Sequence, residues 1–309
     1  MKILKDKLAL KWSYMKAIKN MYFNRNRLYF TFGVTRGVPL RDIHLELANI
    51  CNLSCAMCFL KDMKRKKKIM EFELIKKICN ETRRLNSIGL NNWGEPLLHP
   101  DLVPILRFLK DKNRDINVIF ATNGTLLTHD MIIELFSSGL DHLQFSLEGI
   151  KKTYETIRGV PYNSLKQIIE SALAVRNGDR YNTAISICVT VFQENEDDIK
   201  NIEEQWGNKV DKIYYQPKLE LALASSRTNK CYELWKGHLV VLSSGDVVPC
   251  CVDYEGILKL GNAYKEPLYK IYNSEKMINL RKLHLEGDLP SFCKKCSEYN
   301  SPNIPKRFN

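Results

Sequence analysis

The sequence HLELANICNLSCAMC occupies residues 44–58 and decides how the rest of the chain is interpreted. Its first five residues, 44–48, are mostly apolar and predict a short buried strand. Cys51, Cys55 and Cys58 follow in a C-x3-C-x2-C spacing on one short loop. Three thiolates can bind three irons of a four-iron cubane, which leaves the fourth iron open to a small molecule.

The alternatives to an iron–sulfur cluster are a zinc site and three unrelated reduced cysteines. Structural zinc prefers four protein ligands, and catalytic zinc with three protein ligands usually has histidine among them. No histidine lies in residues 51–58. Soft thiolates at this spacing therefore favour an iron–sulfur cluster with one open iron.

Strand and helix patterns alternate from residue 42 to residue 217. The expected strands are 44–48, 87–91, 116–121, 142–147, 184–192 and 210–215. The expected helices are 72–85, 101–110, 129–137, 162–175 and 197–205. Apolar strands that alternate with helices predict an α/β fold with a parallel sheet, curved or barrel-like.

Polar and glycine-containing segments follow several of these strands. Gly94-Glu95-Pro96 comes after the second strand, Asn123 after the third, and Ser146 ends the fourth. Functional groups of parallel α/β barrels gather at the carboxyl ends of the strands. These segments are therefore expected to share one rim with the cysteine loop.

The chain resembles the radical S-adenosylmethionine (SAM) enzymes over about residues 42–217. The residues that carry the resemblance are Cys51, Cys55, Cys58, Gly94, Glu95, Pro96, Asn123, Ser146 and Arg158. It implies a partial (β/α)6 TIM-like barrel in which the three cysteines bind a 4Fe–4S cluster. It further implies that Gly94-Glu95-Pro96 meets the SAM amino group, and that Ser146 and Arg158 lie at the SAM carboxylate.

This sequence departs from the family pattern at two positions. Met57 precedes the third cysteine, where an aromatic residue is frequent, and a methionine can still pack against the edge of a ring. Glu148 stands where an aspartate is frequent, which keeps the charge. The resemblance implies that SAM is cleaved reductively to methionine and a 5′-deoxyadenosyl radical, which removes hydrogen from a substrate.

A second cysteine set lies near the end of the chain. It consists of Cys231, Cys250, Cys293 and Cys296, with a hairpin turn expected at Ser243–Asp246. Four thiolates suit either zinc or a closed 4Fe–4S cluster, and spacing alone leaves both open. The segment resembles the small α+β SPASM domain in its one-cluster form, called twitch. This resemblance implies an auxiliary 4Fe–4S cluster.

Cys251 directly follows one of these expected ligands and is a candidate catalytic residue. In sulfatase-maturing relatives, an aspartate at this place acts as a base. In some sugar-epimerising relatives, a cysteine of this domain returns a hydrogen atom to the substrate radical. The alternatives are an inert buried cysteine or another cluster ligand; Cys79 and Cys188 are expected to be core residues.

Composition limits the setting and the partners of this 309-residue chain. Its formal net charge of +12 favours anionic partners without selecting one, and nucleic acid is not expected. With ten cysteines, no signal peptide and no transmembrane segment, a reducing cytoplasm is expected. The basic run Lys64–Lys68 is expected to be a solvated loop face, with contact to an anionic substrate as the alternative.

Three segments are expected: a basic N-terminal extension (1–40), a radical SAM core (41–220) and a SPASM/twitch segment (221–309). The extension is interpreted as an amphipathic helix over 3–23 that packs on the core, or that contacts a membrane surface or nucleic acid. The expected activity is oxidation of a small molecule or peptide, with the auxiliary cluster accepting an electron and flavodoxin or ferredoxin supplying one. The alternatives are an epimerase that uses Cys251 and a non-catalytic iron–sulfur or zinc module.

Overall fold

The computed structural model describes residues 26–82, 84–219 and 230–296. The helix expected over 3–23 lies outside these residues. The strands are β1 (Asp42–Leu45), β2 (Ser87–Gly89), β3 (Asn117–Thr122), β4 (His142–Ser146), β5 (Ala184–Val191), β6 (Lys212–Pro217), β7 (His238–Val241), β8 (Asp246–Val248) and β9 (Gly261–Asn262). The α-helices are α2 (Phe72–Glu81), α3 (Leu102–Lys112), α4 (His129–Ser137), α5 (Lys151–Arg158), α6 (Tyr162–Gly178), α7 (Ile199–Trp206), α8 (Leu268–Tyr272), α9 (Glu275–Glu286) and α10 (Ser291–Lys294). Short 3-10 helices are η1 (Phe59–Asp62), η2 (Pro96–Leu98), η3 (Gln193–Asp198) and η4 (Tyr232–Trp235).

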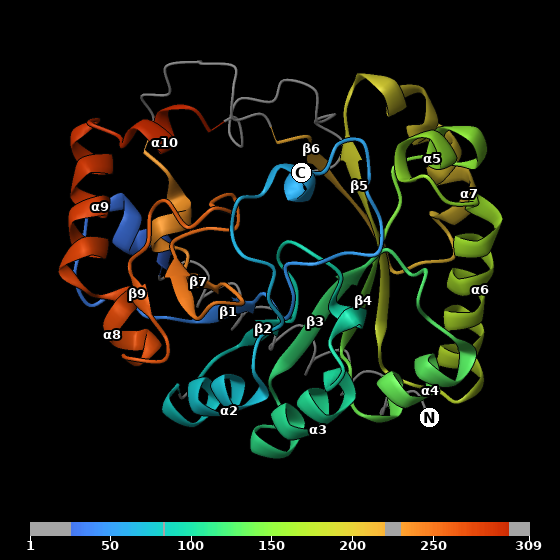
Figure 1. Ribbon diagram of the computed structural model, residues 1–309, viewed down its shortest axis with the longest axis horizontal. Helices are drawn as coiled ribbons and strands as arrows, with labels where there is room; N and C mark the ends of the chain where they lie inside the picture. The colour runs from blue at the N-terminus through green and yellow to red at the C-terminus, as the bar shows by residue number, and fades with distance from the viewer. Residues whose placement is uncertain (1–25, 83, 220–229, 297–309) are drawn as a thin grey trace, which may run out of the picture.

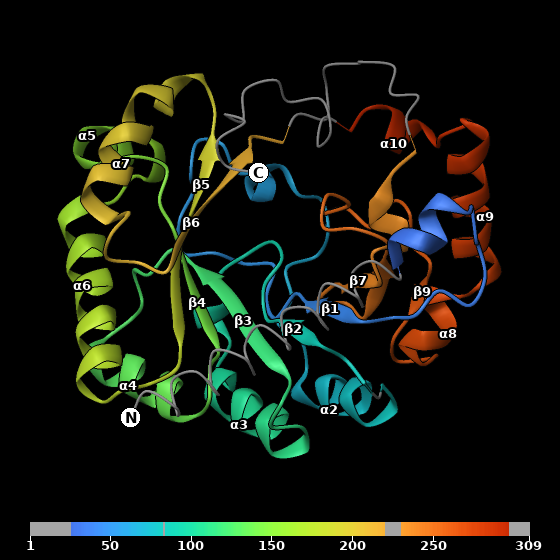
Figure 2. The same ribbon diagram turned by 180° about the vertical axis from the view of Figure 1, so that it is seen from behind.

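One curved sheet organises the described part of the chain, with strand order β6-β5-β4-β3-β2-β1-β7-β8-β9. Each neighbouring pair from β6 to β7 is parallel, whereas β7–β8 and β8–β9 are antiparallel. Helices α2, α3, α4 and α6 lie on the convex side of the parallel strands (Figure 1; Figure 2). The α/β fold with a partial barrel is confirmed, because the sheet curves while β6 and β9 remain its two ends.

The parallel strands are held by apolar side chains that the helices cover. Strand β5 buries Ile185, Ile187 and Val189 completely, and Trp206 at the end of α7 is also fully buried. The three β5 residues are spaced by two, so they share the one face of the strand that packs into the core. This packing fixes the carboxyl ends of the strands, where the predicted functional residues lie.

Strand β1 ends at Leu45, three residues earlier than expected. Beyond it, the chain turns toward the segment before α2: the Met70 N–H donates to the Leu47 carbonyl at 2.7 Å, and Ala48 forms an antiparallel bridge with Ile69. Residues 47 and 48 therefore pair with the segment just before α2, while the Glu46 N–H still donates to the Val241 carbonyl of β7 at 2.9 Å.

The C-terminal segment continues the same sheet and core. Strand β7 pairs in parallel with β1, and the β7–β8 turn occupies the expected hairpin position, with Gly245 at a φ of +84°. The Trp235 indole N–H donates to the Val34 carbonyl at 2.7 Å. Residues from both sides of position 220 belong to one buried hydrophobic cluster. The expected domain boundary near residue 220 stays a prediction.

Among the described helices, none is long and apolar enough to span a membrane.

Candidate functional site

A cavity of about 420 Å³ opens at the carboxyl ends of the parallel strands. It brings together most of the residues predicted for SAM chemistry. The predicted residues in its lining are Cys51, Cys55, Cys58, Gly94, Glu95, Asn123, Ser146, Arg158 and Cys251. Pro96 is buried beside this lining, at the first position of η2. One cavity therefore joins positions that are up to 200 residues apart in the chain.

Hydrogen-bond donors surround the sulfurs of the cysteine loop. The Leu53 N–H donates to Cys51 Sγ at 3.4 Å, and the Asn123 side-chain amide donates to the same sulfur at 3.7 Å. The Arg158 guanidinium donates to Cys55 Sγ at 3.5 Å. Donors aimed at sulfur suit thiolates that bind an anionic cluster, since such hydrogen bonds tune iron–sulfur sites. The residues present therefore fit a cluster at this loop.

No three His, Cys, Asp or Glu side chains within 26–82, 84–219 and 230–296 converge closely enough to hold a single metal ion. A four-iron cubane places its thiolates on different irons, so its cysteine sulfurs need not converge on one point. The arrangement of Cys51, Cys55 and Cys58 is compatible with a cubane on these grounds.

Arg158 is held against the cysteine loop by a buried carboxylate. Its guanidinium forms two hydrogen bonds with Glu148, at 2.5 and 2.7 Å, and the Glu148 side chain is only 2% exposed. Burial acts to lower the pKa of Arg158, but the charge and hydrogen bonds of Glu148 outweigh it and raise that pKa overall. Glu148 is thus the partner that orients Arg158 toward Cys55.

The segment after β2 approaches the backbone between β1 and the cysteine loop more closely than a side chain would permit. Gly94 has a φ of +114°, and a Cβ there would lie 2.2 Å from the Ala48 carbonyl oxygen. The Glu95 N–H donates to the Ile50 carbonyl at 2.9 Å. Glycine therefore lets the backbone of this segment lie directly beside the cysteine loop.

Glu95 joins the rim segments of β2 and β3. Its carboxylate accepts hydrogen bonds from Thr122 Oγ1 at 2.7 Å and from the Asn123 N–H at 2.9 Å. Burial raises the pKa of Glu95, although these hydrogen bonds act in the opposite direction. The Glu95 side chain thus ties the two rim segments together, and the backbone beside Gly94 lies at the cavity.

The second cysteine set lies outside this cavity lining. Burial, followed by the charges of Cys251, Cys231 and Cys293, raises the pKa of the Cys250 thiol well above its usual value, so these sulfurs lie within electrostatic range. The Cys296 N–H donates to the Cys293 carbonyl at 3.3 Å, which forms the expected turn. The ligand role of these cysteines remains a prediction.

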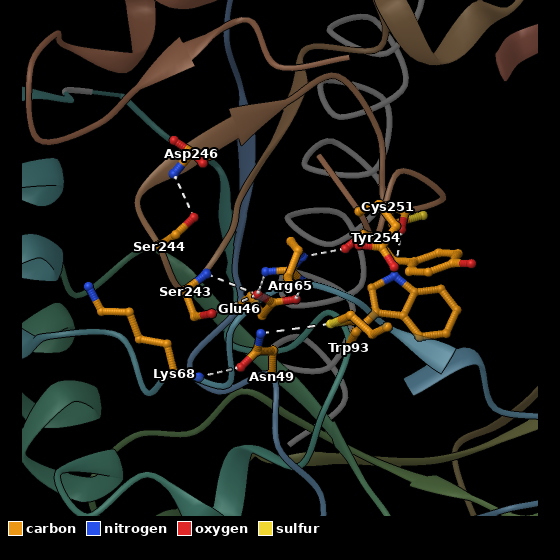
Figure 3. Close-up of polar contacts among 12 residues, drawn as sticks. Glu46, Asn49, Arg65, Lys68, Trp93, Ser243, Ser244, Asp246, Cys251 and Tyr254 are labelled. Carbon is orange, nitrogen blue, oxygen red and sulfur yellow. Dashed lines mark hydrogen bonds and ion pairs between the residues drawn. The ribbon is translucent and has the colours of Figure 1, made fainter. Parts of the chain in front are cut away.

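Cys251 is exposed and contributes to the cavity lining, unlike its neighbour Cys250. Its carbonyl oxygen accepts a hydrogen bond from the Trp93 indole N–H at 2.8 Å (Figure 3). The C-terminal segment therefore supplies one wall of the cavity.

Sequence reasoning missed several cavity residues. Cys188, expected in the core, lies in the lining with Thr190, and burial raises the pKa of Cys188 to about 12. The period of two along β5 places residues 188 and 190 on one face, which was a usable signal. Gln216 of β6 donates to Thr190 Oγ1 at 3.1 Å. Cys79, by contrast, packs against the core as expected.

Comparison with known proteins agrees with this geometry. Residues 45–205 match the radical SAM superfamily, and residues 231–297 match SPASM, an iron–sulfur cluster-binding domain. The tungsten-containing aldehyde ferredoxin oxidoreductase cofactor-modifying protein of Pyrococcus furiosus is 27% identical over 165 residues, 50% of this chain and 45% of that protein. A probable GTP 3′,8-cyclase of Saccharolobus islandicus is 34% identical over 144 residues, 45% of this chain and 46% of that protein. The matched part is thus less than half of either relative.

Solved structures share the fold over most of the chain. BtrN in complex with AdoMet and 2-DOIA has a TM-score of 0.60 at 17% identity, covering 84% of this chain and 94% of that chain. The enzyme anSMEcpe with bound AdoMet has a TM-score of 0.62 at 15% identity, covering 84% and 91%. Streptococcus suis SuiB bound to precursor peptide SuiA has a TM-score of 0.62 at 14% identity, covering 83% and 69%.

The fold and the site define a class of iron–sulfur enzymes that use SAM. The chain belongs to the radical SAM superfamily, since that match covers just over half of its 309 residues. Its C-terminal segment matches SPASM, and together the two domains imply 4Fe–4S clusters and SAM as cofactors.

Proposed function

We propose that this protein cleaves SAM reductively and removes a hydrogen atom from a small molecule or peptide, which it oxidises. The observation that carries the proposal is the shared cavity. Its lining includes three cysteines, Gly94, Asn123, Ser146 and Arg158, all at the carboxyl ends of the parallel strands. A non-catalytic iron–sulfur or zinc module would have no use for a cavity of this kind.

Different residues of the cavity would bind the cluster and the two polar groups of SAM. Cys51, Cys55 and Cys58 would hold the cluster, which supplies the electron that cleaves SAM to methionine and a 5′-deoxyadenosyl radical. Backbone carbonyl oxygens beside Gly94 would accept hydrogen bonds from the SAM amino group. Ser146 and Arg158 would bind its carboxylate, with Glu148 fixing the direction of the guanidinium.

The C-terminal cysteines support oxidation as the outcome. Cys231, Cys250, Cys293 and Cys296 would hold an auxiliary cluster able to accept one electron from the substrate radical, which would also release a proton. Flavodoxin or ferredoxin would supply the electron for SAM cleavage in a reducing cytoplasm. Cys251 supports a second candidate, an epimerase that returns a hydrogen atom, because this residue is exposed at the cavity. The 2-DOIA bound by BtrN and the Cp18Cys peptide bound by anSMEcpe are the first molecules to screen as substrates.

Anaerobic reconstitution with iron and sulfide tests the proposal. We expect iron for two four-iron clusters, and 5′-deoxyadenosine formation from SAM with dithionite. Cys58→Ala should abolish cleavage, because the open-iron cluster loses a ligand. The matched control Cys79→Ala, outside the cavity, should retain it. Zinc in place of iron, without SAM cleavage by the unaltered chain, would reject the proposal.

Turnover in heavy water separates the two reaction classes. If the protein is an epimerase, Cys251→Ala should still form 5′-deoxyadenosine while the product loses its solvent deuterium. If it catalyses dehydrogenation, the unaltered chain should yield a product with two fewer hydrogens and no deuterium at the reacting carbon. In that case, a role of Cys251 as hydrogen donor is excluded.

A further inference from the structure

Two side chains of the radical SAM core donate hydrogen bonds to the backbone of the C-terminal segment beside the cavity. We propose that Arg65 and Trp93 are positioning residues that hold residues 251–255, and thereby fix Cys250 and Cys251 relative to the cysteine loop 51–58. We call Glu46, Arg65, Trp93, Ser243 and Tyr254 the clasp (Figure 3). The inference rests on the proposed function, in which the position of the C-terminal cysteines matters for the reaction.

Arg65 was expected on a solvated loop face, and the structure corrects this. Its side chain is 12% exposed and forms a two-point ion pair with Glu46, at 2.7 and 2.9 Å, whose side chain is fully buried. Its Nε–H also donates to the Tyr254 carbonyl. A guanidinium can satisfy a carboxylate and a carbonyl together because its donors form a rigid fork.

Glu46 also reaches the C-terminal segment. Its Oε2 accepts hydrogen bonds from the Ser243 N–H at 2.9 Å and from Ser243 Oγ at 3.0 Å. Glu46 stands directly after β1, five residues before Cys51. One buried carboxylate thus connects the strand that leads to the cysteine loop, the basic run and the β7–β8 turn.

Trp93 makes the second contact. Besides its hydrogen bond to the Cys251 carbonyl, its ring lies 5.3 Å from the Tyr254 ring. Phe59, which directly follows Cys58, stacks on Tyr254 at 5.4 Å with an interplanar angle of 24°. The Phe59 and Trp93 rings also lie 6.1 Å apart, so the Tyr254 ring belongs to one aromatic cluster with a residue next to the cysteine loop and one of the rim segment after β2.

The backbone of the basic run, residues 64–68, is fixed by hydrogen bonds to Asn49, so the run can hold the C-terminal segment in position. The Asn49 side chain donates to the Lys66 carbonyl at 3.0 Å and accepts from the Lys68 N–H at 2.6 Å. The Lys64 N–H donates to the Glu255 carboxylate at 2.8 Å. The basic run is thus anchored by Asn49, shortly after β1, and binds residues 254 and 255, while Trp93 binds residue 251.

Trp93→Phe and Arg65→Lys test the inference, with Lys67→Gln as control for charge, since Lys67 is an exposed member of the same run. Phenylalanine keeps the ring and loses the N–H; lysine keeps the charge and loses the fork. We expect hydrogen–deuterium exchange at residues 251–258 to become about twofold to tenfold faster in both variants, with residues 117–122 unchanged.

Pulsed EPR on the two reduced clusters gives the readout specific to positioning. The distribution of distances between clusters should broaden in Trp93→Phe and Arg65→Lys but not in Lys67→Gln. Unchanged exchange and an unchanged distribution in Trp93→Phe would overturn the inference, and so would faster exchange throughout the chain. Exchange needs neither cluster nor turnover, so a protein that fails to cleave SAM still tests the clasp.

Discussion

The buried Glu148 carboxylate supplies the counter-charge of Arg158, whose guanidinium also donates to Cys55 Sγ. Arg158→Met would leave that carboxylate almost fully buried without its counter-charge. Such losses typically cost about 3–5 kcal/mol of stability. We expect the free energy of unfolding in urea to fall by this amount, and SAM binding to weaken.

The double variant Arg158→Met, Glu148→Leu is the control for this prediction. It should recover much of the stability, because no unpaired charge remains, but not the SAM binding. Equal stability of the single variant and the unaltered chain would contradict the prediction.

A buried histidine pair predicts a pH dependence. The His44 and His238 rings lie 4.6 Å apart, and burial, with the charges of His238 and Lys236 adding to it against Glu233, lowers the pKa of His44 to about 3. Burial and then Lys236 lower the pKa of His238 to about 4. Below about pH 6.5, the unfolded chain therefore binds protons that the folded chain does not.

The free energy of unfolding should consequently fall from pH 7 to pH 5, by at most about 1.4 kcal/mol per pH unit for each histidine. Urea titrations of the apoprotein at several pH values measure this slope. His238→Gln should make the slope shallower, whereas His129→Gln, at an exposed position of α4, should leave it unchanged. A slope that is the same in all three proteins would refute the assignment.

Single residues were predictable where their signal is local. Cys51, Gly94 and Ser146 belong to short motifs at strand ends, so their approximate positions followed from the order of the strands. Arg65 was misjudged because its partners, Glu46 and Tyr254, are 19 and 189 residues away. The sequence of a basic run does not indicate which of its residues is buried.

At the scale of elements, the segment after β2 tolerates no side chain at Gly94. An added Cβ would lie 2.2 Å from the Ala48 oxygen and 2.8 Å from the Ile50 oxygen, both backbone atoms. Gly94→Ala should therefore displace the segment and weaken SAM binding about tenfold or more. Equilibrium dialysis with labelled SAM measures this constant.

Gly178→Ala is the matched control, because a Cβ at Gly178, the last residue of α6, meets nothing within 4 Å. It should bind SAM as the unaltered chain does. A normal SAM affinity in Gly94→Ala would show that the close approach is dispensable.

The six parallel strands and most helices of the core were predicted, because apolar runs and helical periodicity are strong over these stretches. Helix α4 was predicted with its observed bounds, His129–Ser137, where Thr128 caps the helix by accepting from the Met131 N–H at 3.2 Å. Helix α5 was missed: it has eight residues, of which only Tyr154 and Ile157 are buried. Strand β7 was not assigned, since its pairing with β1 joins residues about 200 apart.

For the whole molecule, the continuous sheet predicts one cooperative unfolding transition. Strand β1 pairs with β2 on one side and β7 on the other, and one buried cluster includes Ile43, Trp235 and Leu239. Far-UV circular dichroism and tryptophan fluorescence of the apoprotein should report the same midpoint in urea. Two separated midpoints would show that the SPASM segment unfolds by itself.

The Glu46 carboxylate also has a consequence for engineering. It is satisfied from two places, by Arg65 in the basic run and by Ser243 in the C-terminal segment. A SPASM segment grafted from a relative would keep a backbone N–H opposite Glu46 but would lose the Ser243 hydroxyl. The fully buried Glu46 carboxylate would then have one donor fewer, unless the grafted residue were a serine or its equivalent. The C-terminal segment should therefore not be exchanged by itself, and successful chimaeras should carry residues 46, 65 and 243 together.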